Sequence, residues 1–303
     1  MKPQPPKHSI TIRSYQELEQ YSRAFGAGYL NLLVLVGAPG LEKSHMVRQA
    51  VGSDVCWIEG HATALGLYSE LWEHSNRPVV IDDVDGLYAD PKALRLLKCL
   101  CQSDPVKRLA WHSHAATLVR AGIPRSFRTT SRVAIIANDW RTLNSNVAAV
   151  EDRGHVISFE PSPLEVHRRT ARWFWDQEIF DFFAQRLALI RQASMRPYVQ
   201  AWELKRAGLD WRRLVLARWL SGPALLVAQL KADRSFQSEE ARVQAFRACG
   251  GGCRATYFNH ARNLEPRCEA PSIVLQNDPP HEPRASEKLF EFIKRRHRRL
   301  GND

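Results

Sequence analysis

An apolar segment that runs into a glycine turn constrains this chain most. Residues 32–44 read Leu-Leu-Val-Leu-Val-Gly-Ala-Pro-Gly-Leu-Glu-Lys-Ser, a buried strand followed by a loop that ends in lysine and a hydroxyl. A phosphate loop needs glycines that let backbone N–H groups approach the anion, a lysine for the β- and γ-phosphate oxygens, and a hydroxyl for magnesium. Gly37, Gly40, Lys43 and Ser44 meet these needs. The segment therefore predicts a site for ATP or another nucleoside triphosphate with Mg²⁺.

One position departs from the usual G-x-x-x-x-G-K-[ST] pattern. Glu42 stands where a glycine normally precedes the lysine. Two like charges about 4 Å apart repel by roughly 4 kcal/mol at an effective dielectric constant near 20, unless the side chain turns to solvent. Whether ATP binds and is hydrolysed therefore depends on this carboxylate.

The whole-chain composition favours a cytoplasmic protein. The 303 residues, 44% of them hydrophobic, contain no run of about 18 apolar residues that could span a bilayer. The first residues do not continue into the apolar stretch of a secretory signal. Cys56, Cys99 and Cys101 fall in a strand-like and a helix-like segment, where reduced thiols pack as small hydrophobic groups.

Positive charge is concentrated in the second half of the chain. Residues 1–162 carry 18 Lys and Arg against 16 Asp and Glu, whereas residues 163–303 carry 25 against 16. Such an asymmetry suits a polyanionic partner, usually nucleic acid, although it also serves solubility.

Strands and helices alternate over the first half of the chain. Apolar runs predict five strands, at 31–36, 55–59, 78–83, 132–138 and 155–159. Helices are expected after Ser14, from Lys43 to Val51, from Leu65 to His74 and from Asp90-Pro91 onward. This alternation predicts an α/β fold with a five-stranded parallel sheet, whose ligand lies at the carboxyl ends of the strands.

From Ser162 only helical patterns follow. Four helices are expected at 163–174, 176–189, 194–207 and 210–220, and a further change of composition occurs near Asp233. We therefore predict three domains: an α/β nucleotide domain at 1–161, a helical lid at 162–232 and a small basic helical module at 233–303.

Carboxylates end the strand that comes about 40 residues after the phosphate loop. Asp82 would hold Mg²⁺ and Asp83 would orient or deprotonate the attacking water. The alternative is a turn in which the aspartates are only solvated.

With these motifs in place, residues 14–220 resemble the AAA+ branch of the P-loop ATPases. The resemblance implies that Asn138, at the end of the fourth strand, is the first sensor that places water against the γ-phosphate. It likewise makes Arg153 an arginine finger for a neighbouring subunit and Arg196 the second sensor. The family usually has glutamate at position 83, so the shorter Asp83 favours slow hydrolysis or binding without turnover.

Each arginine has a plainer explanation. Arg153 could be a surface residue or pair with Glu151 or Asp152, and Pro197 explains the segment around Arg196 as a helix start. Three other arginines compete for the finger role, although we expect them at the beginning of the fourth strand, away from the phosphates; they are Arg125, Arg128 and Arg132.

Residues 240–264 predict a short helix, a glycine turn and a second helix, which resembles a helix-turn-helix unit. Its expected core contains Val243, Phe246, Ala255, Phe258 and Leu264. The residues expected to contact DNA are polar or basic: Arg254, Thr256, Asn259 and Arg262, with His260 and Asn263 also partly outward. A purely structural hairpin would show the same pattern.

A rival interpretation makes Cys249, Cys253, His260 and Cys268 zinc ligands, but their spacing matches no common zinc site. The basic run 294–299 adds phosphate affinity or is a solvated helix end.

The sequence thus favours an oligomeric, DNA-associated ATPase that resembles proteins of replication initiation, helicase loading or transposition, with a protein partner in such a process. The alternatives are a degenerate P-loop scaffold that does not hydrolyse ATP and a DNA-binding regulator.

Overall fold

The computed structural model describes residues 8–112, 116–139, 153–233 and 235–264. The chain forms two compact units. Of the described residues, the first contains those up to Val166 together with Gln192–Arg196, and the second contains His167–Arg191 and those from Pro197 to Leu264. The domain boundaries expected from the sequence, at 161 and 232, stay a prediction.

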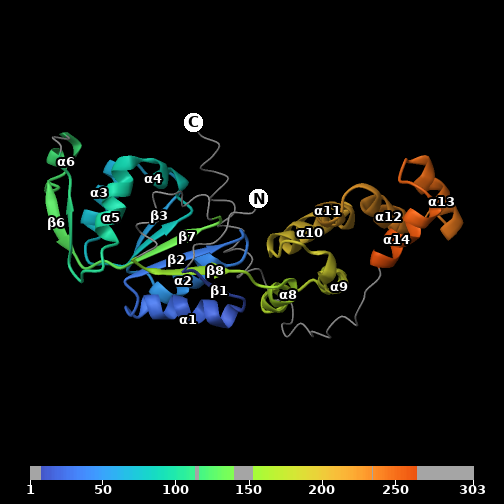
Figure 1. Cartoon of the computed structure of the whole chain (residues 1–303), viewed down its shortest axis with the longest axis horizontal. Coiled ribbons are helices and arrows are strands. Elements are labelled where there is room, and N and C mark those ends of the chain that lie inside the picture. The colour runs from blue at the N-terminus through green and yellow to red at the C-terminus, as the bar shows by residue number, and fades with distance from the viewer. Residues whose placement is uncertain (1–7, 113–115, 140–152, 234, 265–303) are drawn as a thin grey trace. The chain divides into compact units, whose positions relative to one another are not determined.

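A parallel sheet of six strands forms the centre of the first unit (Figure 1). Its order is β1-β8-β2-β7-β4-β3. The strands are β1 (Ile10–Ile12), β2 (Leu32–Gly37), β3 (Cys56–Glu59), β4 (Val79–Asp82), β7 (Val133–Ala137) and β8 (His155–Phe159). The predicted five strands are all present, so the parallel α/β fold is confirmed, but the count of five is wrong. The sixth, β1, has only three residues and pairs with the distant β8, so it has too little periodicity to be seen in the sequence.

Helices lie on both sides of this sheet (Figure 1). They are α1 (Tyr15–Gly26), α2 (Lys43–Val51), α3 (Ala64–Glu73), α4 (Asp85–Ala89) and α5 (Pro91–Leu100). The expected start of α1 is confirmed, since Ser14 caps Glu17 N–H and the Glu17 carboxylate accepts from Ser14 N–H.

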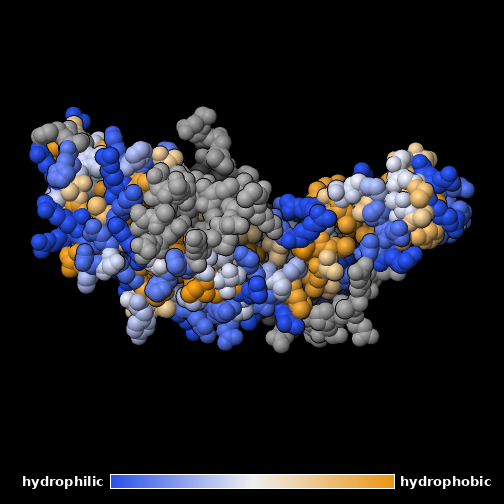
Figure 2. Space-filling view, in the orientation of Figure 1, coloured by the Kyte–Doolittle hydropathy of each residue, from blue (hydrophilic) through white to orange (hydrophobic). Residues whose placement is uncertain are grey.

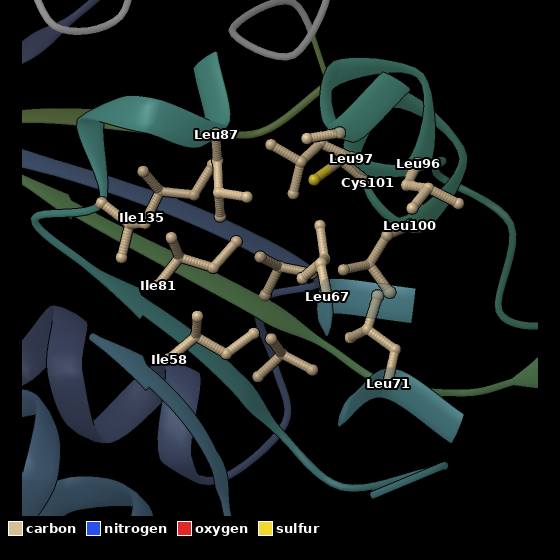
Figure 3. Packing of buried hydrophobic residues seen from close by; sticks show 14 of the residues in the cluster. Ile58, Leu67, Leu71, Ile81, Leu87, Leu96, Leu97, Leu100, Cys101 and Ile135 are labelled. Atoms are coloured by element: carbon tan, nitrogen blue, oxygen red, sulfur yellow. The ribbon is translucent and has the colours of Figure 1, made fainter. Parts of the chain in front are cut away.

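The core of the first unit lies between the sheet and helices α3 and α5 (Figure 3). Strand residues such as Ile58, Ile81 and Ile135 meet Leu67 of α3 and Leu97 of α5. Two of the three cysteines expected to pack as hydrophobic groups, Cys56 and Cys101, are buried here, and burial raises the pKa of both thiols to about 12. Cys99 is half-buried against the same core.

A β-hairpin with a short helix at its tip was missed from the sequence. Strand β5 (Lys107–Ala110), helix α6 (Ala116–Arg120) and strand β6 (Ser126–Thr129) lie between α5 and β7. The two strands pair antiparallel as a separate sheet. Four-residue strands interrupted by a helix give no extended pattern, so only the folded chain shows them.

The second unit is helical. Its helices are α8 (Pro163–Thr170), which begins in the first unit, α9 (Gln177–Ala184), α10 (Arg196–Arg206), α11 (Trp211–Trp219), α12 (Gly222–Ala232), α13 (Glu239–Ala248) and α14 (Arg254–Leu264). A 3-10 turn at Leu187–Leu189 follows α9. Helix α12 was not predicted. It supplies Val227 and Leu230 to the core of α13 and α14.

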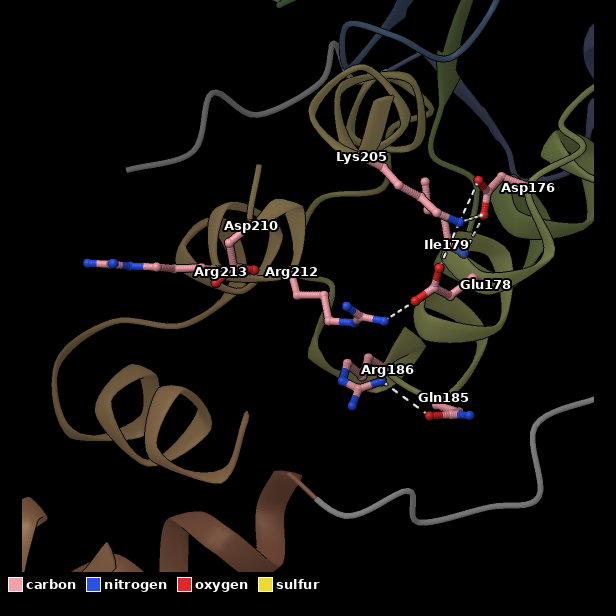
Figure 4. Close-up of polar contacts among 9 residues, drawn as sticks. All are labelled: Asp176, Glu178, Ile179, Gln185, Arg186, Lys205, Asp210, Arg212 and Arg213. Atoms are coloured by element: carbon pink, nitrogen blue, oxygen red, sulfur yellow. Dashed lines mark hydrogen bonds and ion pairs between the residues drawn. The ribbon is translucent and has the colours of Figure 1, made fainter. Parts of the chain in front are cut away.

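Ion pairs join three helices of this unit (Figure 4). Lys205 of α10 lies 2.8 Å from Asp176 and 2.7 Å from Glu178, at the start of α9. Arg212 of α11 also binds Glu178. Because these side chains are partly exposed, the network orients the helices more than it stabilises them.

His167 is a buried titratable group of the second unit. Its side chain is 0% exposed, its ring stacks on Phe180 with the ring centroids 3.8 Å apart, and its Nδ1 lies 2.8 Å from the hydroxyl of Tyr198. Its Nε2 has no hydrogen-bond partner within the residues that the structure describes. Burial lowers the pKa of His167 to about 4.

This histidine makes the second unit acid-sensitive. Between pH 6.5 and 4 the unfolded chain binds a proton that the folded chain does not, so the free energy of unfolding should fall as the pH falls through this window. The total loss is on the order of 3 kcal/mol. Urea unfolding at pH 7 and pH 5, followed by tryptophan fluorescence, measures it. His167→Gln should lose less stability between the two pH values than the native chain, whereas the exposed control His61→Gln should behave as native. Equal losses in all three proteins would contradict the prediction.

Candidate nucleotide site

The predicted phosphate loop connects β2 to α2. A close contact at one position and the backbone conformation at another explain two of its glycines. A Cβ atom on Gly37 would lie 2.7 Å from the carbonyl oxygen of Phe159 in β8, too close for any side chain. Gly40 has φ +78°, a backbone conformation that side chains disfavour. Glycine is therefore required at position 37 by the close contact and favoured at position 40 by the backbone conformation.

Lys43, the first residue of α2, is folded into the loop. Its side chain is only 5% exposed. The ammonium donates hydrogen bonds to the carbonyl oxygens of Gly37 (2.7 Å) and Ala38 (2.9 Å) and to Oδ1 of Asn138 (3.2 Å). Burial lowers the pKa of Lys43 to about 8, although the carboxylates of Asp82 and Asp83 act in the opposite direction. A buried cation at this point suits an anionic ligand that replaces the loop carbonyls.

Ser44 and Asp82 form the pair expected to hold magnesium. The Ser44 hydroxyl donates to Oδ1 of Asp82, at the carboxyl end of β4, over 2.9 Å. Burial raises the pKa of Asp82, while the hydrogen bond from Ser44 lowers it. A hydroxyl and a carboxylate at this spacing are the oxygen donors that Mg²⁺ prefers, so the residues fit the ion.

Asp83 follows Asp82 with an unusual backbone. Its φ is +57°, and its N–H donates to the carbonyl oxygen of Ile136 in β7 over 3.0 Å. Its side chain is exposed. Asp83 thus still pairs with β7 through its N–H, the chain turns after it toward α4, and its part in activating water stays a prediction.

Asn138 directly follows β7, which lies between β2 and β4 in the sheet. Its contact with Lys43 places it at the same sheet edge as the phosphate loop. The carboxyl ends of three neighbouring strands therefore bring together Lys43, Ser44, Asp82 and Asn138, and their roles toward a nucleotide stay predictions.

A short segment of the first unit, Gln192–Arg196, lies against the phosphate loop. Met195 N–H donates to the carbonyl oxygen of Gly40 over 2.9 Å, and the Ser194 hydroxyl donates to that of Pro39 over 3.2 Å. Arg196 lies beside the loop as well, since a Cβ atom on Gly40 would be 2.9 Å from its Cγ. We call Gln192–Arg196 the strap. The role of Arg196 as the second sensor stays a prediction. Ser194 and Met195 were missed, because neither residue type carries a recognisable signal.

Because the strap lies so close to Gly40, we expect a single methyl group added at this residue to destabilise the fold. In Gly40→Ala the new Cβ would lie 2.4 Å from Ser194 Oγ and 2.9 Å from Arg196 Cγ, in addition to the strain of a positive φ. We expect the free energy of unfolding to fall by about 2 kcal/mol or more. Gly60→Ala is a matched control, since Gly60 has φ +80° with nothing within 4 Å, and should lose only the strain of about 1 kcal/mol. Chemical unfolding of the two variants measures the difference, and equal losses would refute the contact.

Glu42 has the left-handed backbone conformation that glycine normally supplies here. Its φ is 59° and its ψ is 16°, and it directly precedes the first residue of α2. For a residue with a Cβ atom this conformation costs about 1 kcal/mol. The side chain is half-buried. The departure from the usual pattern at this position therefore consists of a strained backbone and an added carboxylate.

Arg153 lies at the other end of the sheet. It comes just before β8 and donates to the carbonyl oxygen of Lys98 over 2.7 Å. It does not contact the phosphate loop of its own chain, and its action on a second subunit stays a prediction.

Two of the competing arginines belong to the missed hairpin, Arg128 within β6 and Arg125 just before it. Arg132 is at the amino end of β7, where it donates to the carbonyl oxygen of Gly26 over 3.1 Å, away from the phosphate loop as expected.

The C-terminal helices α13 and α14 are confirmed as a helix pair, with one correction to their core. Val243 and Phe246 are buried as expected, but Tyr257 and Ala261 fill the place assigned to Ala255, which is exposed. The reason is helical spacing: Tyr257, Ala261 and Leu264 follow one another at intervals of four and three residues and share a face, whereas Ala255 lies about 160° around the helix from Tyr257.

Of the predicted DNA-contacting residues, Arg254, Asn259 and Arg262 are exposed and Thr256 is half-buried. Arg254 pairs with Glu240 and lies over the ring of Phe258. The interpretation as a helix-turn-helix that binds DNA stays a prediction.

The described residues contain no group of three or more His, Cys, Asp or Glu side chains that could hold a metal ion. Of the four residues weighed as zinc ligands, Cys268 lies outside them, as does the basic run 294–299. Among these same residues, no helix combines the length and apolarity needed to cross a membrane.

Comparisons with known proteins give low similarity. No protein-family model matches the chain. An uncharacterized 36.7 kDa protein from the nrdC–mobD intergenic region of Enterobacteria phage T4 is 28% identical over 120 residues. The match covers 37% of this chain, and the chain spans only 37% of the length of that relative.

Among solved structures, the chain is similar to domain III of the replication initiation protein DnaA from Thermotoga maritima, at 13% identity and a TM-score of 0.43, covering 73% of this chain and 100% of that one. It is also similar to Cdc6p from Pyrobaculum aerophilum, at 12% identity and a TM-score of 0.45, covering 86% and 88%. The roles of the site residues therefore rest on the contacts described above.

Several of the features that carried the resemblance to the AAA+ branch are present in the fold. A strand, loop and helix begin the site, an acidic strand end and a polar strand tip adjoin it, and Arg196 lies beside it. The first unit thus resembles the AAA+ P-loop ATPases in fold.

Proposed function

We propose that this protein is an AAA+-type ATPase that binds ATP with Mg²⁺ at the carboxyl edge of its parallel sheet. One observation carries the proposal: Lys43, Ser44, Asp82 and Asn138 lie together around the loop between β2 and α2. A buried lysine, a hydroxyl paired with a carboxylate, and an amide are the groups that phosphate transfer to water needs.

Each residue has a distinct part in this proposal. Lys43 exchanges the carbonyls of Gly37 and Ala38 for phosphate oxygens. Ser44 and Asp82 hold Mg²⁺, which when bound neutralises charge on the phosphate oxygens. Asn138 and Asp83 orient the attacking water, and Asp83 accepts its proton. Because Asp83 is shorter than glutamate, turnover is slow.

We further propose that the protein forms an oligomer and binds DNA. Arg153 completes the site of a second copy of the chain, so nucleotide binding favours an oligomer. Helices α13 and α14 bind DNA through Arg254, Thr256, Asn259 and Arg262. The resemblance to AAA+ proteins favours a role, with a protein partner, in replication initiation, helicase loading or transposition, in the cytoplasm.

Nucleotide binding and sizing test this proposal together. Purified protein should bind a fluorescent ATP analogue only when Mg²⁺ is present, and its mass in light scattering should rise with ATP and rise further with duplex DNA. Phosphate release, measured with and without DNA, gives the turnover. A protein that binds no nucleotide at any Mg²⁺ concentration would refute the proposal.

Glu42 favours a second candidate function. Its half-buried carboxylate stands beside the loop at which the phosphates would bind. If the repulsion prevents binding, the chain is a P-loop scaffold without hydrolysis, or a DNA-binding regulator whose first unit only oligomerises. Oligomers and DNA complexes that form identically with and without ATP would support this candidate.

A further inference from the structure

A basic stretch without acids lies outside every site described so far. Residues 105–138 contain no Asp or Glu, although the other residues up to 162 carry more acids than bases. The same stretch contains six cations: Lys107, Arg108, Arg120, Arg125, Arg128 and Arg132. Most of it folds as the hairpin of β5 and β6 with α6. In Figure 1 the hairpin lies at one end of the first unit, and in Figure 2 that end carries several strongly hydrophilic residues.

The inner face of the hairpin is fixed to the core of the unit. Leu109 and Phe127, which face each other across the two strands, are buried. Phe127 packs against the ring of Trp72, with centroids 5.3 Å apart, and the hydroxyl of Tyr68 donates to the carbonyl oxygen of Pro124 over 2.8 Å. These contacts hold the hairpin in a fixed position against the core of the first unit.

Lys107 anchors the base of the hairpin. Its side chain is 1% exposed, and its ammonium donates to the carbonyl oxygen of Ser131 over 2.6 Å and to the side chain of Asn31. Lys107 thus stabilises the base of the hairpin and is not available to a ligand. The cations on the solvent-exposed outer face of the hairpin are other residues.

The outer face presents two arginines directly opposite each other. Arg108 of β5 pairs in register with Arg128 of β6, and both are exposed. No carboxylate among the described residues pairs with either. Arg108 has instead a contact of 3.5 Å with the hydroxyl of Ser126. Like charges directly opposite in a sheet are destabilising, so this pair does not serve the stability of the hairpin. A bound anion would remove the repulsion.

We propose that this outer face of the hairpin binds the phosphate backbone of duplex DNA. Each guanidinium is a planar fork that matches a phosphate group, and a DNA strand carries one negative charge per roughly 3.4 Å of axis, a density that two adjacent arginines can follow. The hydroxyl of Ser126, which accepts from Arg108, adds a donor of the type that contacts phosphates. A two-stranded β-ribbon also fits the major groove. This surface is separate from α13 and α14, and it does not depend on nucleotide binding.

Charge removal in the full-length chain tests the surface. Arg108→Gln/Arg128→Gln should weaken binding to a short fluorescein-labelled duplex at least tenfold at low salt, measured by anisotropy. The slope of log affinity against log salt should decrease by about 2, because two phosphate contacts are lost. Arg108→Lys/Arg128→Lys retains the charges and should keep most of that slope.

The matched control removes the same charge elsewhere. Arg23→Gln/Arg77→Gln takes two exposed arginines that pair with Glu19 and Asp54 and should leave the slope unchanged. If the hairpin variant and this control bind equally well, with circular dichroism showing both folded, the proposal is wrong. It is also wrong if polyglutamate binds the native chain as tightly as DNA and with the same loss in the variant, since the partner is then an acidic protein.

A chain that binds DNA through the hairpin but no nucleotide would refute the proposed ATPase and leave this surface intact.

Discussion

Replacing Lys43 with alanine is expected to weaken binding of Mg²⁺ and ATP by about 100-fold or more. The ammonium is buried in the loop and offers three donors, which now go to two carbonyls and Asn138. Charge-assisted hydrogen bonds contribute about 1.5–3 kcal/mol each, so losing two such bonds to phosphate weakens binding by on the order of 3 kcal/mol. Each 1.4 kcal/mol changes the dissociation constant by a factor of about 10. Titration of a fluorescent ATP analogue measures the change.

The substitution should not unfold the chain. The pKa of Lys43 is lowered to about 8, which means that burial penalises the charged form at neutral pH. Removing this charge relieves that penalty and offsets the loss of packing. Lys92→Ala, an exposed lysine at the start of α5, should bind the nucleotide as the native chain does. Unchanged affinity in Lys43→Ala would show that the loop does not hold phosphates.

Glu42→Gly should raise nucleotide affinity at least tenfold. The repulsion between its carboxylate and a phosphate is bounded by roughly 4 kcal/mol at 4 Å, and the half-buried side chain feels part of it. Folding stability should change little. Glycine removes about 1 kcal/mol of strain at φ 59°, but its freer unfolded chain costs a similar amount. A gain in nucleotide affinity with an unchanged unfolding midpoint would therefore be due to removal of the Glu42 carboxylate charge. Calorimetric titration with Mg²⁺ and ATP measures it.

Glu42→Gln separates charge from backbone. It keeps the Cβ atom in the left-handed conformation and removes only the charge. We expect it to recover most of the gain seen with glycine. If glycine alone raises affinity, backbone strain is the cause, and if neither does, the carboxylate already points away from the phosphates.

The central strands of the fold were predictable because each is a continuous apolar run covered on both faces. Their order in the sheet was not, since pairing such as that of β1 with β8 joins residues far apart in the chain. The hairpin was missed for a related reason. Its strands have four residues each, and Leu109 and Phe127 become core residues only when α3 and α5 cover them.

The site was predictable wherever position on a strand end determines proximity. Lys43, Ser44, Asp82 and Asn138 converge because the carboxyl ends of parallel strands share one edge. The left-handed conformation of Glu42 and the contacts of Ser194 have no signature in the sequence, because they depend on how the loop packs after folding. Tyr257, rather than Ala255, enters the core because it shares a helix face with Ala261 and Leu264.

The strap has a consequence for anyone who dissects this chain by truncation or protease. A fragment that stops at Val166 contains every strand of the parallel sheet, yet it lacks Ser194 and Met195 and so leaves the carbonyls of Pro39 and Gly40 without these donors. The two units are interleaved along the polypeptide, and neither can be excised with a single cut.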